Sequence, residues 1–315
     1  MRIFITGATG FVGRWLALEL REAGHEVLPA SAENAHSQVD VTEPQALFTA
    51  LRAATPDAVA HLAAVSSASD AARDPEKTFG VAVGGTVNLL ETLRELDRVP
   101  AVLVVSSSEV YGRPKPEELP LTEDSPLRPG TTYSLSKVAQ ESVALAYAAR
   151  LHLPLVVTRS FNHIGPGQRP VFVVPALAER VLAVKRGEAT DIPVGNVDVR
   201  RDFTDVRDVV RAYRLLLEGL AGGSIERGGR AFNVASGKAV SIRHIVELLA
   251  DAAGVEPIIR VDPSLVREDD AEEIKGDAAK LRAACGWQPE HSLSETLEAV
   301  WQYAEESTTR QGMEH

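Results

Sequence analysis

Residues 3–13 read Ile3-Phe4-Ile5-Thr6-Gly7-Ala8-Thr9-Gly10-Phe11-Val12-Gly13, and the predicted fold follows from them. Its apolar start predicts a buried strand, and a helix is expected over residues 14–23 after the glycine-rich turn. In that context Gly7 allows the tight turn, and Gly10 lets the backbone approach a pyrophosphate. Gly13 lets the helix pack closely on the strand. Free N–H groups at the helix start favour anions. The cofactor-binding candidates in this turn are Gly7, Gly10, Phe11, Val12 and Gly13; the alternative is a glycine turn without a ligand.

Strands and helices alternate up to about residue 160, and this alternation predicts an α/β fold with a Rossmann-type, doubly wound parallel sheet. Proline- and glycine-rich runs after that point indicate a smaller, mixed α/β substrate-binding lobe. The predicted strands are 26–30, a short one before Asp40, 58–64, 101–105, 155–158, 230–234 and 258–261, and the later helices are 86–96, 133–150, 203–220, 241–253 and 292–305. We assign 1–159, with about 203–236, to the dinucleotide-binding domain, and about 160–202 with 237–307 to the second lobe.

Composition narrows the class of protein. The net charge of −11 argues against nucleic-acid and anionic-membrane partners, which call for basic patches. The single cysteine, Cys285, excludes an internal disulfide and a thiolate metal cluster, so no metal site is expected. The chain shows no leader before the first strand and no apolar run long enough to span a bilayer. We therefore expect a soluble, cytoplasmic protein.

Further cofactor contacts are expected at the ends of the predicted strands. Asp40 could accept a hydrogen bond from the adenine amino group, with Val41 beside it, and small residues in Leu62-Ala63-Ala64 would leave room for the cofactor. An acid or an arginine after the strand 26–30 would select NAD(H) or NADP(H). That position holds Ser31-Ala32-Glu33-Asn34, where Glu33 sits late, so the choice stays open. His61 is interpreted as a core histidine.

Tyr133 and Lys137 lie four residues apart on a predicted helix and therefore share one face. An ammonium there can pull the phenol pKa down from about 10, and such a phenol can exchange a proton with a carbonyl or hydroxyl. A surface Tyr–Lys pair is the alternative. The hydroxyl-rich segment Ser106-Ser107-Ser108-Glu109 follows the strand 101–105, where open α/β sheets bind substrates.

The chain resembles the extended short-chain dehydrogenase/reductase superfamily in four motifs: T-G-A-T-G-F-V-G at 6–13, H-L-A-A at 61–64, S-S-S-E-V-Y-G at 106–112 and Y-S-L-S-K at 133–137. The second half is most similar to the GDP-6-deoxy-4-keto-hexose reductases, which make GDP-D-rhamnose. That similarity rests on R-S-F-N-H-I-G-P-G-Q at 159–168, V-G-N at 194–196 and R-D-F-T-D-V-R-D at 201–208. GDP-mannose 4,6-dehydratases carry Thr in place of Ser107 and an Arg-Lys pair in place of Pro175-Ala176.

The resemblance implies reduction of the C4 keto group of a nucleotide-linked 4-keto-6-deoxyhexose, GDP-linked by preference, by NADPH or NADH. Tyr133 would donate the proton, Lys137 would bind the nicotinamide ribose, and Ser107 or Ser108 would hydrogen-bond the carbonyl. Glu109 matches the base that removes the C5 proton in dehydratases of the superfamily, so a 4,6-dehydratase, a 4-epimerase or a bifunctional dehydratase–reductase stays open. The implied substrate-binding residues are Asn162, Val173, Asn196, Arg201, Arg267 and Asp270.

Two positions depart from the family pattern, because Ala82 stands where Asn is usual and Thr132 where Pro precedes the tyrosine. A non-catalytic dinucleotide sensor on the same fold is a further alternative, although such proteins typically lose the tyrosine. The helices 86–96 and 133–150 are expected to pair across a two-fold axis into a homodimeric four-helix bundle, as is common in the superfamily. The nucleotide base and the stereochemistry at C4 are left open.

Overall fold

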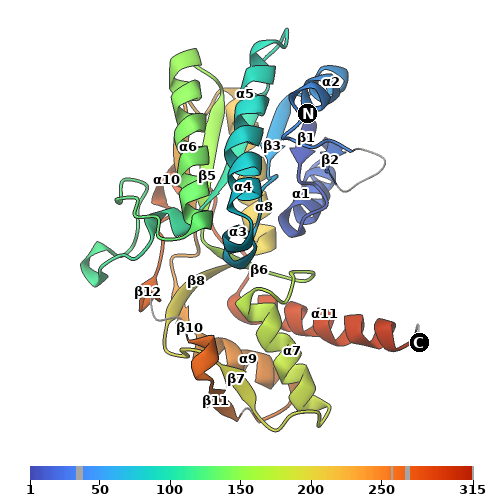
Figure 1. The fold of residues 1–315 in the computed structure, drawn as a ribbon, viewed down its shortest axis with the longest axis vertical. Coiled ribbons are helices and arrows are strands. Elements are labelled where there is room, and N and C mark those ends of the chain that lie inside the picture. The colour runs from blue at the N-terminus through green and yellow to red at the C-terminus, as the bar shows by residue number, and fades with distance from the viewer. Residues whose placement is uncertain (33–37, 257, 267–269, 314–315) are drawn as a thin grey trace.

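A six-stranded parallel sheet forms the larger part of the molecule (Figure 1). The computed structural model describes residues 1–32, 38–256, 258–266 and 270–313, with side chains up to residue 307. The strand order is β2-β1-β3-β4-β5-β9, and each neighbouring pair is parallel. The strands are β1 (Arg2–Thr6), β2 (Glu26–Ala30), β3 (Ala58–His61), β4 (Ala101–Ser107), β5 (Leu155–Ser160) and β9 (Arg230–Val234). The predicted Rossmann-type sheet is confirmed.

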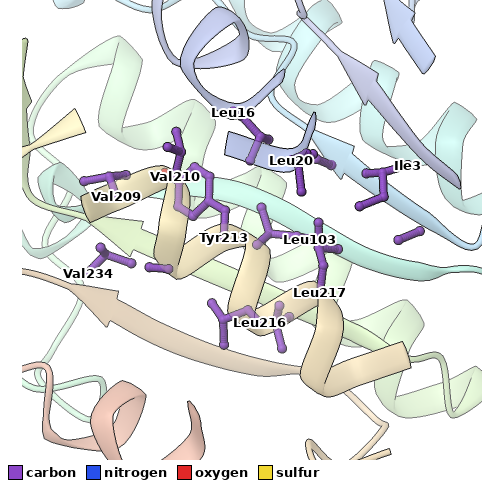
Figure 2. Packing of buried hydrophobic residues seen from close by; sticks show 14 of the residues in the cluster. Ile3, Leu16, Leu20, Leu103, Val209, Val210, Tyr213, Leu216, Leu217 and Val234 are labelled. Carbon is purple, nitrogen blue, oxygen red and sulfur yellow. The ribbon is translucent and has the colours of Figure 1, made fainter. Parts of the chain in front are cut away.

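Helices cover both faces of this sheet, which is why its strands are apolar in continuous runs rather than in alternation. Helices α1 (Phe11–Glu22), α8 (Val206–Gly222) and α10 (Ala279–Cys285) pack on one face. Helices α2 (Pro44–Ala54), α5 (Gly85–Arg94) and α6 (Thr132–Leu151) pack on the other. Figure 2 shows the first of these cores, where Tyr213, Leu216 and Leu217 of α8 lie against Leu103 of β4 and face Leu16 and Leu20 of α1.

The smaller lobe lies below the larger sheet in Figure 1 and carries its own core. Its strands β10 (Ala239–Ser241), β8 (Arg200–Asp205) and β12 (Glu273–Ile274) are adjacent in that order, β6 (Asn162–Ile164) pairs with β8, and β7 (Ile192–Val194) pairs with β11 (Ile259–Val261). Its helices are α7 (Val173–Lys185), α9 (Ile242–Ala253) and α11 (Leu293–Met313). In the described part of the chain, no helix combines the length and the apolar character that a membrane crossing needs.

Short helical segments lead into the site. Helices α3 (Ala68–Arg73) and α4 (Pro75–Phe79) follow β3, and the π-helical segment η1 (Gly80–Gly84) joins α4 to α5. The 3₁₀ segment η2 (Ser108–Tyr111) continues β4, and η3 (Pro116–Glu118) and η4 (Pro263–Leu265) lie in loops. Ala82, one of the two residues that depart from the family pattern, is in the π-helical segment.

Two sequence expectations differ from the structure. The short strand expected just before Asp40 is not part of the sheet. Between β2 and Asp40, the described residues form only an isolated bridge of Ser31 with Gln38. The helix expected from residue 203 begins at Val206, since Arg200–Asp205 pairs as strand β8 and the Asp205 carboxylate caps α8 by accepting from the Arg207 N–H at 2.7 Å.

Candidate active site

The site lies where the strand order reverses. The chain runs from β1 outward to β2 and then returns to the other side of β1 as β3, and ligands of open α/β sheets bind at the carboxyl ends of strands next to such a reversal. The glycine turn leaves β1 at this point. Gly7 has a φ of +72°, and a Cβ there would come within 2.9 Å of the Ala63 backbone nitrogen. A Cβ on Gly13 would collide with the carbonyl oxygen of Gly7, so both positions require glycine.

The first turn of α1 fits a dinucleotide pyrophosphate. Its N-cap is Gly10, which offers no side-chain acceptor, and the first turn carries no acidic residue that would repel a phosphate. The N–H groups that open a helix have no partner within it, and the dipole there favours negative charge. The residues beside the turn are half-buried: Leu62, Ala63 and Ala64. The two alanines put small side chains along the expected path of the cofactor.

Asp40, the residue expected near the adenine, is half-buried, and its Oδ1 accepts from the Thr42 N–H at 2.9 Å and from the Thr42 hydroxyl at 2.8 Å. Val41 is buried, and its carbonyl accepts from Asn88 of α5 at 2.9 Å. The predicted alternative acid Glu33 lies outside the described residues.

Tyr133 projects from the first turn of α6. This helix starts at a capping box, in which the Thr131 hydroxyl accepts from the Ser134 N–H at 3.1 Å and the Ser134 hydroxyl accepts from the Thr131 N–H at 2.9 Å. The cap fixes the start of the helix and therefore the direction of Tyr133. Tyr133 is half-buried, and the Ser107 hydroxyl lies near enough to its phenol to act on its pKa.

The pKa of Tyr133 is raised above its ordinary value, first by burial and then by the negative charge of Glu109, although the Ser107 hydrogen bond lowers it. This differs from the expectation that Lys137 would pull it towards neutrality. The phenol therefore keeps its proton at neutral pH, which is the state that a proton donor needs.

Lys137 lies one turn further along α6 and is buried, with 3% of its surface exposed. Its ammonium donates to the Val105 carbonyl at 2.8 Å and to Gln140 Oε1 at 2.9 Å, and lies 6.0 Å from the centre of the Tyr133 ring. Burial lowers the pKa of Lys137 to about 8, so the side chain is still mostly charged at neutral pH.

Of the two candidate serines, Ser107 contacts Tyr133, whereas Ser108 is buried in the first turn of η2. Ser107 Oγ also accepts from the Glu109 N–H at 3.2 Å, which fixes the hydroxyl at the end of β4. Glu109 is exposed, and its charge acts on Tyr133. The structure thus brings Ser107, Glu109, Tyr133 and Lys137 together.

The predicted substrate residues belong to the smaller lobe. Asn162 is exposed on β6 and pairs in register with Phe203 of β8, two residues from Arg201. Arg201 is 8% exposed, forms an ion pair with Asp270 and donates to the Ala271 carbonyl at 2.9 Å. Val173 and Asn196 are exposed at the start of α7 and after β7, and Arg267 lies outside the described residues.

A loop of the smaller lobe is attached to helix α1, just after the glycine turn. Arg14 and Trp15 of α1 donate to the carbonyls of Gly167 at 3.3 Å and Pro166 at 3.1 Å. On the other side of this loop, Arg169 reaches Asp70 at 3.3 Å. The loop therefore connects the two lobes beside the site.

A buried ion pair holds α6 on the sheet. Arg159 of β5 donates through Nε to both carboxylate oxygens of Glu141 at 3.1 Å, and through Nη1 to the Tyr111 hydroxyl at 3.0 Å and the Glu123 carbonyl at 2.8 Å. Both members of the pair are almost fully buried; burial lowers the pKa of Arg159, but Glu141 and Tyr111 outweigh it and raise the pKa above its ordinary value.

Three residues of the site region were not identified as its members from the sequence: Gln140, Thr86 and Arg169. Gln140 could have been found, because it lies three residues after Lys137 and so on the same side of the helix. His61, interpreted as a core residue, is fully buried between the hydroxyls of Thr6 and Thr86, at 2.8 and 3.1 Å.

Comparison with known proteins gives the family. The model of a family described as GDP-mannose 4,6 dehydratase matches residues 4–300. The chain is 38% identical over 301 residues to a GDP-6-deoxy-D-mannose reductase from Pseudomonas aeruginosa, covering 95% of each protein. It is 32% identical to a GDP-6-deoxy-D-talose 4-dehydrogenase from Aggregatibacter actinomycetemcomitans, covering 91% of this chain and 92% of that protein. Other relatives bear the names of a UDP-glucose 4-epimerase and GDP-mannose 4,6-dehydratases.

A solved structure gives the same result. The structure of RMD from Pseudomonas aeruginosa complexed with NADPH superimposes with a TM-score of 0.86 at 36% identity, over 97% of this chain and 98% of that one. The expected resemblance to the extended short-chain dehydrogenase/reductases is confirmed. The chain therefore belongs to the GDP-mannose 4,6 dehydratase family, within that superfamily.

Proposed function

We propose that this protein is an NAD(P)H-dependent reductase of the C4 keto group of a nucleotide-linked 4-keto-6-deoxyhexose. The substrate we favour is GDP-4-dehydro-6-deoxy-D-mannose, reduced to GDP-D-rhamnose. The observation that carries the proposal is the contact of a protonated Tyr133 with Ser107, one helical turn from the buried ammonium of Lys137. Relatives named GDP-6-deoxy-D-mannose reductase and GDP-6-deoxy-D-talose 4-dehydrogenase match almost the whole chain.

Reduction of a ketone needs a hydride at carbon and a proton at oxygen. When bound, the dihydronicotinamide supplies the hydride to C4. Tyr133 gives its phenolic proton to the oxygen that becomes the C4 hydroxyl, and Ser107 hydrogen-bonds that oxygen as its negative charge develops. The phenolate left behind regains a proton from solvent, so each turnover consumes one hydride and one proton.

Lys137 stabilises the phenolate after the proton has left. In this proposal its ammonium also donates to the nicotinamide ribose. Because it is buried, its charge acts through a medium of low dielectric and is screened little by salt. The substrate nucleotide would contact the smaller lobe at Asn162, Val173, Asn196 and the Arg201–Asp270 pair, with Arg267 completing the set.

The test is the oxidation of NADPH and of NADH, followed at 340 nm, with GDP-4-dehydro-6-deoxy-D-mannose and with its dTDP- and UDP-linked counterparts. We expect turnover of the GDP-linked sugar and a loss of at least about 100-fold in kcat for Tyr133→Phe, as for removal of a general acid. A protein that binds NADPH, reduces none of these sugars and is indifferent to Tyr133→Phe would be a dinucleotide sensor instead.

A second candidate function follows from Glu109, whose charge acts on Tyr133 from the end of β4. A carboxylate there could remove the C5 proton in a 4,6-dehydratase. A 4-epimerase would use the same tyrosine and lysine. Incubation with GDP-mannose and NADP alone separates the cases. A reductase leaves the mixture unchanged, whereas a dehydratase forms the 4-keto-6-deoxy sugar.

We also propose that the protein is cytoplasmic and forms a homodimer through a four-helix bundle of α5 and α6. Leu135 of α6 is 48% exposed, and Val138 beside it is only half-buried, which leaves apolar surface along this helix. Light scattering coupled to size-exclusion chromatography measures the mass, and Leu135→Glu should lower it to that of a monomer. The division into a cofactor domain (1–159, with about 203–236) and a substrate lobe (about 160–202 and 237–307) stays part of the proposal.

A further inference from the structure

The ammonium of Lys137 has two acceptors inside the protein. An ammonium has three N–H donors. One goes to the Val105 carbonyl of β4 at 2.8 Å and one to Oε1 of Gln140 at 2.9 Å. Within the described chain, the third donor is therefore the one left for the cofactor and Tyr133. Gln140 is only 1% exposed, so its amide is as deeply buried as the lysine it contacts.

The amide of Gln140 has only one workable orientation. Its Nε2 donates to the Thr86 hydroxyl of α5 at 3.0 Å, and that hydroxyl donates in turn to the Ala82 carbonyl at 2.6 Å. Since the Thr86 proton is used on Ala82, its oxygen must accept from Gln140. A flipped amide would turn an NH₂ group towards the Lys137 ammonium and leave two donors facing each other.

The chain of hydrogen bonds continues to β1. The Thr86 oxygen is also 3.1 Å from His61 Nε2, so that nitrogen carries the proton and Nδ1 accepts from the Thr6 hydroxyl at 2.8 Å. The Thr6 oxygen accepts in turn from the Ala63 N–H at 3.2 Å. Burial and the Lys137 charge lower the pKa of His61 to about 3, which keeps the imidazole neutral, as this pattern requires.

We propose that Gln140 is a positioning residue for Lys137, held by Thr86 and His61, which fixes the ammonium so that one donor faces the cofactor and Tyr133. The proposal rests on the role given to Lys137 under the proposed function. The second acceptor of Lys137 is thus a side chain on the same helix. The orientation of its amide is fixed by hydrogen bonds that lead through Thr86 and His61 to the end of strand β1. The hydrogen bonds from Gln140 and from His61 meet at the Thr86 hydroxyl, which donates to the Ala82 carbonyl in the π-helical segment.

The surroundings of Lys137 allow its charge to be tested through Gln140. Val105 of β4 and Thr86 of α5 contribute neutral groups. Among the titratable groups of this region, His61 on β3 feels the charge of Lys137, and the Tyr133 ring centre lies 6.0 Å from its ammonium. Glu109 on η2 acts on Tyr133, and Glu141 on α6 pairs with Arg159 on β5. The charged residues of α3 and α4 are Asp70, Arg73, Glu76 and Lys77, and all have side chains open to solvent.

The test uses two nearly isosteric variants with opposite expected effects. Gln140→Leu removes an acceptor from a buried ammonium, so the lysine loses its proton more easily and the alkaline limb of kcat/KM for the keto-sugar should move to lower pH by about one unit. Gln140→Glu places a carboxylate beside the ammonium, and the limb should move to higher pH. If Gln140 only filled space, the alkaline limbs of the two variants would move little, or would move in the same direction.

The same variants are measured without the sugar substrate. The pH at which NADPH affinity falls, followed by cofactor fluorescence, should shift in the same two directions because the ammonium holds the ribose. This readout stays valid if the protein turns over a different sugar, so the two proposals fail separately. Thr86→Ser keeps the hydroxyl and should behave as wild type, whereas Thr86→Val should shift the limb in the direction of Gln140→Leu.

Circular dichroism and thermal unfolding identify any variant that does not fold. If Gln140→Leu does not fold, Gln140→Glu and the two Thr86 variants still decide the question. Wild-type pH limbs in both activity and NADPH binding for the folded Gln140 variants would overturn the proposal. Shifts in the same direction for the leucine and glutamate variants would do so as well.

Discussion

The buried imidazole of His61 makes the stability of the protein depend on acid in a way that can be worked out. Its pKa falls from 6.5 to about 3 on folding, chiefly through burial. Below pH 6.5 the unfolded chain therefore binds a proton that the folded protein refuses, and stability falls as the pH is lowered towards 3. Each pH unit corresponds to about 1.4 kcal/mol, so two units, from 6.5 to 4.5, amount to about 2.7 kcal/mol.

The experiment compares wild type with His61→Gln, whose amide can accept from one hydroxyl and donate to the other but does not titrate. Urea unfolding is followed by tryptophan fluorescence at pH 7.0 and pH 4.5. Acid effects of the carboxylates are common to both proteins and cancel in the difference. We expect wild type to lose about 2–3 kcal/mol more free energy of unfolding than the variant over this range.

His244 supplies the control, because it is half-exposed on α9, where its Nδ1 lies 3.4 Å from the Glu247 carboxylate. The His244→Gln variant should follow wild type. Equal acid losses in wild type and His61→Gln would refute the reasoning, since they would mean that His61 takes up its proton in the folded protein. A loss specific to His244→Gln would refute it too.

Three further predictions concern the site. Gly13→Ala places a Cβ against the backbone of the glycine turn, so it should cost about 1–3 kcal/mol in urea unfolding and weaken NADPH binding measured by fluorescence. Glu109→Gln removes the charge that raises the pKa of Tyr133, so a phenol limb in the pH profile of kcat should move to lower pH; an unchanged limb would exclude this electrostatic contact. Asp270→Asn removes the charge paired with Arg201, so it should raise KM for the nucleotide sugar several-fold with little change in kcat, whereas an effect on kcat alone would contradict a binding role.

The elements that the sequence predicted well are those with strong local signals. The glycine turn is recognisable because Gly7 and Gly13 leave no room for a side chain, and the central strands because both their faces are buried. Strands β6, β7, β10 and β12 have only two or three residues, too few for a periodic pattern. The start of α8 was placed three residues early, although Asp205 is a favourable N-cap residue.

The site was predictable in its composition but not in its electrostatics. Spacing alone put Tyr133 and Lys137 on one face of a helix, and the structure agrees. The direction of the Tyr133 pKa shift was not predictable, because it is set by burial and by the charge of Glu109, which only the folded arrangement brings to the phenol. Contacts between distant segments, such as Gln140 with Thr86, depend on how α5 and α6 pack, and a single helix pattern does not contain that information.

The ion pair between Arg159 and Glu141 limits how the protein can move during turnover. Both partners are almost fully buried, so separating them inside the protein would leave two uncompensated buried charges. Each residue of an α-helix advances the helix by about 100° about its axis, and Glu141 is the residue directly after Gln140. A helix clamped there cannot rotate, so the azimuth of Tyr133 and Lys137 is set when the chain folds. Under the proposed function, adjustment to different sugars is then left to the smaller lobe, while Tyr133 keeps one orientation for every substrate.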